Sequence, residues 1–87
     1  GILKMEDEEG IDAKVLAVPI NSVLPIYKHW LEVGDIALER LTQIKHFFEH
    51  YKDLEDGKWV KVIGWYGSDS AKEEILKSHE RYKELGK

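Results

Sequence analysis

Residues 1–18 have the sequence GILKMEDEEGIDAKVLAV, in which two apolar runs flank an acidic stretch. Residues 1–5 and 12–18 have the composition of strands, and Pro19 ends the second one. The acidic stretch between them, residues 6–10, closes with Gly10, which adopts turn conformations that bulkier residues resist. The pattern predicts a β-hairpin with an acidic turn.

Downstream of the hairpin, residues 20–34 contain the turn-forming pair Asn21-Ser22 together with Pro25 and Gly34, and are predicted to be irregular. A helix is expected to begin near Asp35, which is a favourable N-cap residue. Its apolar residues recur at the helical period and predict one buried face over about four turns. This stripe consists of Ala37, Leu41, Ile44, Phe48 and Tyr51.

Asp56 and Gly57 predict a turn, and residues 58–65 predict a third strand because they are rich in Trp, Val and Ile. Ser70 followed by Glu73 has the spacing of a capping box, which places the start of a final helix there. The resulting order is β-β-α-β-α, an α+β chain. Three strands leave open sheet edges, which favour pairing with a further segment or another chain.

The composition limits the classes of function. The 87 residues suffice for one domain, contain no cysteine and carry a net charge of −4. The lysines are interspersed with acids instead of forming the basic stripe that is typical of nucleic-acid binders. The apolar runs are far shorter than the roughly 20 residues of a membrane span. We expect no nucleic acid or membrane partner, and the lack of cysteine fits a cytoplasmic protein.

The acidic hairpin is the first candidate site. Five carboxylates lie within residues 6–12, and carboxylate oxygens are the ligands that Mg²⁺, Mn²⁺ and Ca²⁺ prefer. A solvated surface turn is the alternative. An EF-hand loop does not fit, because placing Gly10 at the loop glycine puts Met5 and Leu16 at ligand positions.

Asp12 and Lys14 form the second candidate. Side chains alternate along a strand, so these two point to the same face. A carboxylate beside an ammonium group is suited to holding a metal ion next to a phosphate. A surface ion pair, worth less than about 1 kcal/mol, is the alternative.

The helix around residue 50 holds the remaining candidates. His46 and His50 lie four residues apart on one helix face, as zinc ligands do, but no third ligand is evident and a polar interface contact is the preferred interpretation. Tyr51 ends the apolar stripe, so its ring is expected to be buried, with the hydroxyl group free to reach a cleft. Lys52 has the position of a cation favoured by the helix dipole.

Taken together, these motifs resemble a known family. Lys4–Glu8, Asp12–Lys14, the run IKHFFEHYKDLE at residues 44–55, and GKWVKV at residues 57–62 are similar, in order and spacing, to the C-terminal half of soluble family I inorganic pyrophosphatases of the bacterial type. The resemblance covers essentially the whole chain and is weakest at residues 20–40.

The resemblance implies a fold, a reaction and a set of site residues. The fold would be part of an OB-like, five-stranded β-barrel with two helices, and the reaction would be the hydrolysis of pyrophosphate to two phosphates with three to four Mg²⁺ ions. Asp7 and Asp12 would be metal ligands, with Asp12 bridging two ions, while Lys14, Tyr51 and Lys52 would hold phosphate oxygens.

The resemblance also implies partners. Bacterial members are hexamers, and His46, His50 and Asp53 resemble positions at subunit contacts. The family carries an upstream motif of three aspartates and further charged residues that this chain lacks, so residues 1–87 are expected to be the C-terminal part of one domain and inactive alone. A non-catalytic ion-binding or assembly module that keeps the second half of the fold is the alternative.

Overall fold

A computed structural model describes residues 1–86 and has the order that the sequence predicts. Its strands are β1 (Ile2–Asp7), β2 (Gly10–Val15) and β3 (Val60–Tyr66), and its helices are α1 (Leu38–His50) and α2 (Ser68–Glu84). Two short 3₁₀ turns, Pro25–Tyr27 and Val33–Asp35, lie in the segment predicted to be irregular. The α+β class and the β-β-α-β-α order are therefore confirmed.

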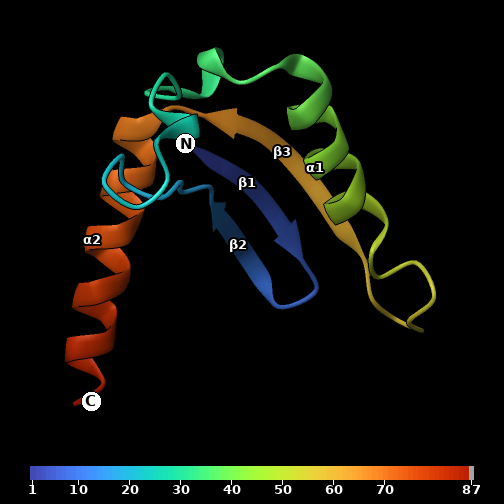
Figure 1. Cartoon of the computed structure of the whole chain (residues 1–87). Coiled ribbons are helices and arrows are strands. Elements are labelled where there is room, and N and C mark those ends of the chain that lie inside the picture. The colour runs from blue at the N-terminus through green and yellow to red at the C-terminus, as the bar shows by residue number, and fades with distance from the viewer. Residues whose placement is uncertain (87) are drawn as a thin grey trace.

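The strands form an antiparallel sheet of order β2-β1-β3, in which β1 is central (Figure 1). The most deeply buried side chains, Ile2, Leu3 and Met5, all belong to β1. On the described chain, β2 and β3 each have one unpaired edge, as the strand count predicted. The five-stranded barrel itself remains an expectation.

The two helices lie on opposite faces of the sheet. Leu3 borders a hollow together with Ile44 and Phe48 of α1, whereas its neighbour Ile2 borders a different hollow with Ser70 and Glu73 of α2. Because successive strand side chains point to opposite faces, these contacts assign α1 to the Leu3 face and α2 to the Ile2 face. No helix within residues 1–86 is long and apolar enough to cross a membrane.

The hairpin differs from its prediction at both ends. β1 continues to Asp7, which is paired with Gly10, so the turn consists of Glu8 and Glu9 alone. Gly10 has a φ of 117°, which confirms its predicted role. β2 ends at Val15 instead of residue 18, because its partner strand β1 begins at Ile2 and leaves little to pair with beyond that point.

Both predicted helix starts were wrong. α1 begins after Ala37, because the Asp35 carboxylate instead accepts hydrogen bonds from the amides of Leu31 and Glu32, at 3.0 and 2.8 Å, and closes the preceding 3₁₀ turn. α2 begins at Ser68, two residues before the predicted Ser70 cap, and Gly67 provides no side-chain cap.

The apolar stripe of α1 is confirmed in its middle and not at its ends. Leu41 is buried, and Ile44 and Phe48 are half-buried. Ala37 precedes the helix, and Tyr51 at the other end is 42% exposed. The indole nitrogen of Trp65 in β3 donates a hydrogen bond to the Leu41 carbonyl at 3.3 Å and anchors α1 to the sheet.

Candidate active site

The register of the hairpin gathers three charged residues on the α1 face of the sheet. Asp12 lies opposite Met5 and Lys14 lies opposite Leu3, so both share the face to which Asp7 also points. The Lys14 ammonium lies 3.1 Å from Asp12 Oδ2. The prediction that Asp12 and Lys14 point the same way is confirmed.

Asp7 occupies the end of β1 and is nearly buried, with 9% of its surface exposed. Its Oδ1 accepts a hydrogen bond from the Glu9 amide at 2.9 Å, which ties the carboxylate to its own turn. Its Oδ2 accepts a hydrogen bond from Lys52 Nζ, also at 2.9 Å. Lys52 is the second residue after α1, so this ion pair joins the end of that helix to the hairpin.

The Asp7–Lys52 pair has a clear electrostatic signature. The hydrogen bond from Lys52 holds the pKa of Asp7 below its ordinary value, and the same hydrogen bond raises the pKa of Lys52 above its own. Both groups are therefore charged at neutral pH. The Lys52 ammonium also lies 3.4 Å from Glu8 Oε1, so two carboxylates surround one cation.

Tyr51 stands between the helix and the charged groups. Its ring stacks on Phe47, with centroids 5.7 Å apart and planes at 20°, and meets the edge of Phe48 at 5.6 Å. These contacts cover part of the ring and leave 42% of the residue exposed. The expectation of a buried Tyr51 ring is therefore only partly met.

Aromatic contacts connect the two ion pairs. Lys14 Nζ lies 5.8 Å from the centre of the Phe48 ring, and Lys52 Nζ lies 5.5 Å from that of Tyr51. A continuous series of side-chain contacts thus leads from Asp12 to Asp7. The structure brings all five predicted site residues together around it: Asp7, Asp12, Lys14, Tyr51 and Lys52.

Glu8 belongs to the acidic hairpin that was predicted as a candidate metal site, but no individual contact was predicted for it. The Glu8 carboxylate accepts a hydrogen bond from the Trp59 amide at 3.4 Å and lies near both Lys52 and Lys58. Its pKa is lowered, first by its own backbone amide. The density of acids in the turn was the available signal, but a partner 51 residues away cannot be inferred from spacing.

Asp7 and Asp12 are the candidate metal ligands on this chain. Within residues 1–86, no three His, Asp or Glu side chains converge closely enough to hold an ion. Asp7 and Asp12 supply hard carboxylate oxygens, which suit Mg²⁺. The His46 and His50 rings lie 4.4 Å apart, and His50 Nδ1 is 2.8 Å from Asp53 Oδ2, at the exposed C-terminal end of α1.

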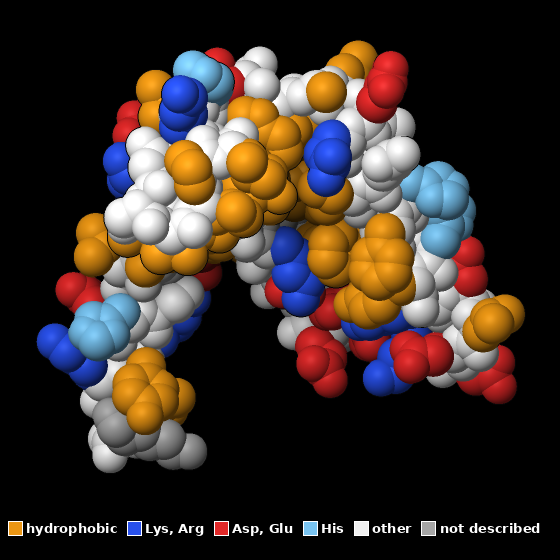
Figure 2. Space-filling view, in the orientation of Figure 1, with side chains coloured by type: hydrophobic (Ala, Val, Ile, Leu, Met, Phe, Trp, Pro, Cys, Tyr) orange, Lys and Arg blue, Asp and Glu red, His pale blue; other side chains and the backbone are white. Residues whose placement is uncertain are grey.

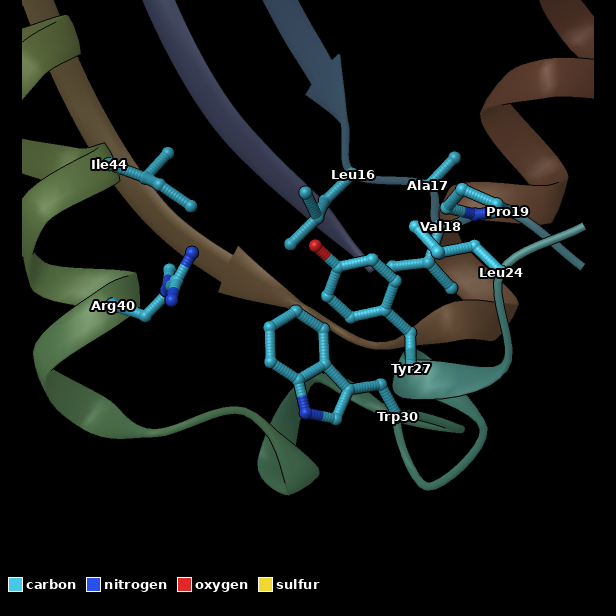
Figure 3. Close-up of a pocket in the computed structure, with 9 residues that line it drawn as sticks. All are labelled: Leu16, Ala17, Val18, Pro19, Leu24, Tyr27, Trp30, Arg40 and Ile44. Atoms are coloured by element: carbon cyan, nitrogen blue, oxygen red, sulfur yellow. The ribbon is translucent and has the colours of Figure 1, made fainter. Parts of the chain in front are cut away.

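An apolar groove adjoins the charged residues. One hollow of about 440 Å³ is lined by Lys14, Phe48 and Trp65 among others, and it shares Leu16 and Ile44 with a second of about 320 Å³. In the second hollow, the rings of Tyr27 and Trp30 project toward Leu16 (Figure 3). Figure 2 shows hydrophobic side chains gathered along the underside of the arch that the two helices and the sheet form.

Known proteins that share the sequence profile and the fold of this chain are inorganic pyrophosphatases. The sequence profile of the family described as inorganic pyrophosphatase matches residues 1–83. The chain belongs to this family, as the resemblance predicted.

Individual relatives agree. The chain is 57% identical over 81 residues to the inorganic pyrophosphatase of Vibrio parahaemolyticus, with 93% of this chain and 46% of that protein covered. It is 54% identical over 83 residues to that of Escherichia coli K12, with 95% and 47% covered. The solved Helicobacter pylori inorganic pyrophosphatase superimposes with a TM-score of 0.91 at 43% identity, over 94% of this chain and 48% of that one. The chain thus spans about half the length of the relatives it matches.

Proposed function

We propose that the chain supplies part of the active site of an inorganic pyrophosphatase, which hydrolyses pyrophosphate to two phosphates with Mg²⁺. The observation that carries this proposal is the convergence of Asp7, Asp12, Lys14, Tyr51 and Lys52 on one sheet face. Family membership suggests the reaction. The carboxylates could bind cations and the neighbouring ammonium groups could bind phosphate, which is the chemistry that this reaction needs.

The donor set fits Mg²⁺. Both candidate ligands are carboxylates, and each already has a cationic group against one oxygen, Lys52 on Asp7 and Lys14 on Asp12. Mg²⁺ is commonly held by one or two carboxylates together with water and substrate phosphates. When bound, it neutralises pyrophosphate oxygens and activates a water molecule near neutral pH.

The residues of this chain have distinct roles in the proposed reaction. Asp7 and Asp12 would hold the cations, three to four in the whole enzyme, and Asp12 would be a ligand shared between two of them. Lys14, Tyr51 and Lys52 bind phosphate oxygens and stabilise the charge that grows on the leaving phosphate, which is a task of positioning and electrostatics. Before substrate binds, each of the two lysines forms an ion pair with an aspartate. These ion pairs orient the ammonium groups toward the face where the anion would bind.

We also propose that the apolar groove beside Lys14 receives the missing N-terminal part of the same domain. The relatives are about twice as long as this chain, and the groove is continuous with the open edge of β2. That part would bring the remaining metal ligands and further strands of an OB-like barrel. The assembled protein would be a cytoplasmic homo-oligomer, a hexamer with contacts near His46, His50 and Asp53.

Complementation tests the function. The 87-residue chain is co-expressed with the complementary half of the Escherichia coli relative, and phosphate release is measured at millimolar Mg²⁺ for the chain and for the copurified complex. We expect turnover by the complex and none by the 87-residue chain, because the hydrolysis rate falls by many orders of magnitude when the ions are not held in fixed positions. A copurified complex without activity would contradict the proposed reaction.

The alternative is a non-catalytic ion-binding or assembly module that keeps the second half of the fold. It predicts that the complex binds metal ions or assembles without releasing phosphate. A turnover by the chain alone within about tenfold of an ordinary enzyme's roughly 10 per second would contradict both interpretations, because the five residues would then suffice.

A further inference from the structure

The Lys52 ammonium group contacts the Asp7 carboxylate oxygen that would otherwise be available to bind a metal ion. Lys52 Nζ is 2.9 Å from Asp7 Oδ2, while Oδ1 accepts a hydrogen bond from the Glu9 amide. The two side chains are 15% and 11% exposed, so water screens the contact poorly. The Lys14–Asp12 pair is longer, at 3.1 Å, and more exposed, at 41% and 28%.

We propose that Lys52 and a divalent cation compete for Asp7, and that binding of the cation releases the Lys52 ammonium group to bind the phosphate anion. This inference rests on the proposed function, in which Asp7 is a metal ligand and Lys52 a phosphate ligand. It makes Lys52 a positioning residue for the cation site as well as a contact for the substrate.

Electrostatics gives the competition its direction. A divalent cation on the Asp7 carboxylate lies within a few ångströms of Nζ, and two cations at that distance in a poorly hydrated pocket repel each other strongly. Lys52 has few neighbouring acids to retreat to: Glu8 Oε1 lies 3.4 Å away and is shared with Lys58 at 3.8 Å. A phosphate anion on the same face is therefore the natural new partner, and cation and anion binding become coupled.

Amine labelling of the wild-type chain measures the release directly. The 87-residue chain, alone and assembled with the complementary half of the Escherichia coli relative, is treated with an acetylating reagent with and without saturating Mg²⁺, and each lysine is quantified by mass spectrometry. We expect Mg²⁺ to accelerate labelling of Lys52 by about 5- to 20-fold, the size of an ordinary coupling between two ligands. Lys77 provides the control. It lies away from the site, with its Nζ 2.6 Å from Glu73 Oε1, and Mg²⁺ should not change its labelling rate.

Binding of Mn²⁺, followed by electron paramagnetic resonance, gives a second measurement. Lys52→Met should tighten Mn²⁺ binding by about the same 5- to 20-fold factor. Lys58→Met removes an equal charge that approaches Glu8 and has no contact with Asp7, so it should change the affinity less than twofold. Equal tightening by both variants would show a general charge effect and overturn the competition.

The remaining outcomes are also decisive. If Mn²⁺ binds while Lys52 labelling stays constant, the ion pair is only a structural link between α1 and the hairpin, and the inference is wrong. The wild-type labelling does not depend on whether Lys52→Met folds. If Lys52 responds to Mg²⁺ but the complex releases no phosphate, the competition stands and the proposed reaction fails.

Discussion

The Glu32 carboxylate caps α2 from a loop 36 residues earlier, accepting hydrogen bonds from the Ser68 amide at 2.6 Å and the Ser68 hydroxyl at 2.7 Å. The helix has no side-chain cap of its own at Gly67. A carboxylate at a helix N-terminus satisfies unpaired amides and interacts favourably with the helix dipole. Glu32 therefore connects the irregular segment after β2 to the last helix of the chain.

The cap gives a pH-dependent prediction. The hydrogen bonds from Ser68 hold the pKa of Glu32 below its ordinary value of 4.5, so its charge stabilises the fold above that pH and the contribution is lost as the pH falls through the lower, folded pKa. Glu32→Gln should lower the melting temperature at pH 7 and have a smaller effect at pH 3. Thermal unfolding followed by circular dichroism checks this, with Glu55→Gln as the control at an exposed position. A loss that is equal at both pH values would contradict a charge-dependent cap.

Burial in β1 predicts a large effect on stability. Leu3 is fully buried, and Leu3→Ala should lower the free energy of unfolding by about 2–5 kcal/mol, because it removes apolar contacts and leaves a cavity. Leu54→Ala is the matched control: Leu54 is fully exposed, and the change should stay within about 0.5 kcal/mol. Urea denaturation of the two variants measures both. Equal effects would mean that β1 is not the core strand.

Asp12 is the predicted bridging ligand, and its neutralisation should be costly. Asp12→Asn in the complemented enzyme should weaken metal binding and reduce turnover by at least about 10²-fold, the effect of removing one key electrostatic partner. Phosphate release across a Mg²⁺ titration is the measurement. Glu6→Gln on the opposite face of the sheet is the control. Near wild-type rates at low Mg²⁺ would exclude the bridging role.

His46 and His50 are predicted to act in assembly. Their rings are in contact, and the His50–Asp53 pair lies at the exposed C-terminal end of α1 and takes no part in the contacts around Asp7. Replacing both with Gln should lower the mass of the assembled protein in analytical ultracentrifugation and leave the intrinsic chemistry intact. His29 and His79, replaced together, serve as the control. An unchanged mass with a collapsed rate would place the pair in the active site.

The order of elements could be predicted because it depends on local patterns. Alternation on β2 placed Asp12 beside Lys14, and Gly10 marked the turn correctly. The helix starts were missed because their caps depend on tertiary contacts. Asp35 is occupied by upstream amides, and the group that caps α2 is Glu32.

The candidate site shows the same division. Spacing alone left the roles of Asp7 and Lys52 open, and only the resemblance to the family assigned both residues to one site. Their 2.9 Å contact crosses 45 residues of sequence, and no periodicity encodes a pairing between a hairpin end and a helix end. The contacts of Glu8 could not be predicted for the same reason, since its amide partner Trp59 lies on the segment leading into β3.

The central position of β1 has a consequence for the order of folding. β1 can pair with β2 as soon as the hairpin turn closes, but its other edge waits for β3, whose Trp65 lies opposite Leu3. Closing a loop of that length is slow compared with forming a hairpin, and proteins dominated by such distant pairings fold late and slowly. We therefore expect the hairpin to form first and to leave the apolar side chains of β1 exposed until β3 docks, an interval in which aggregation competes with folding.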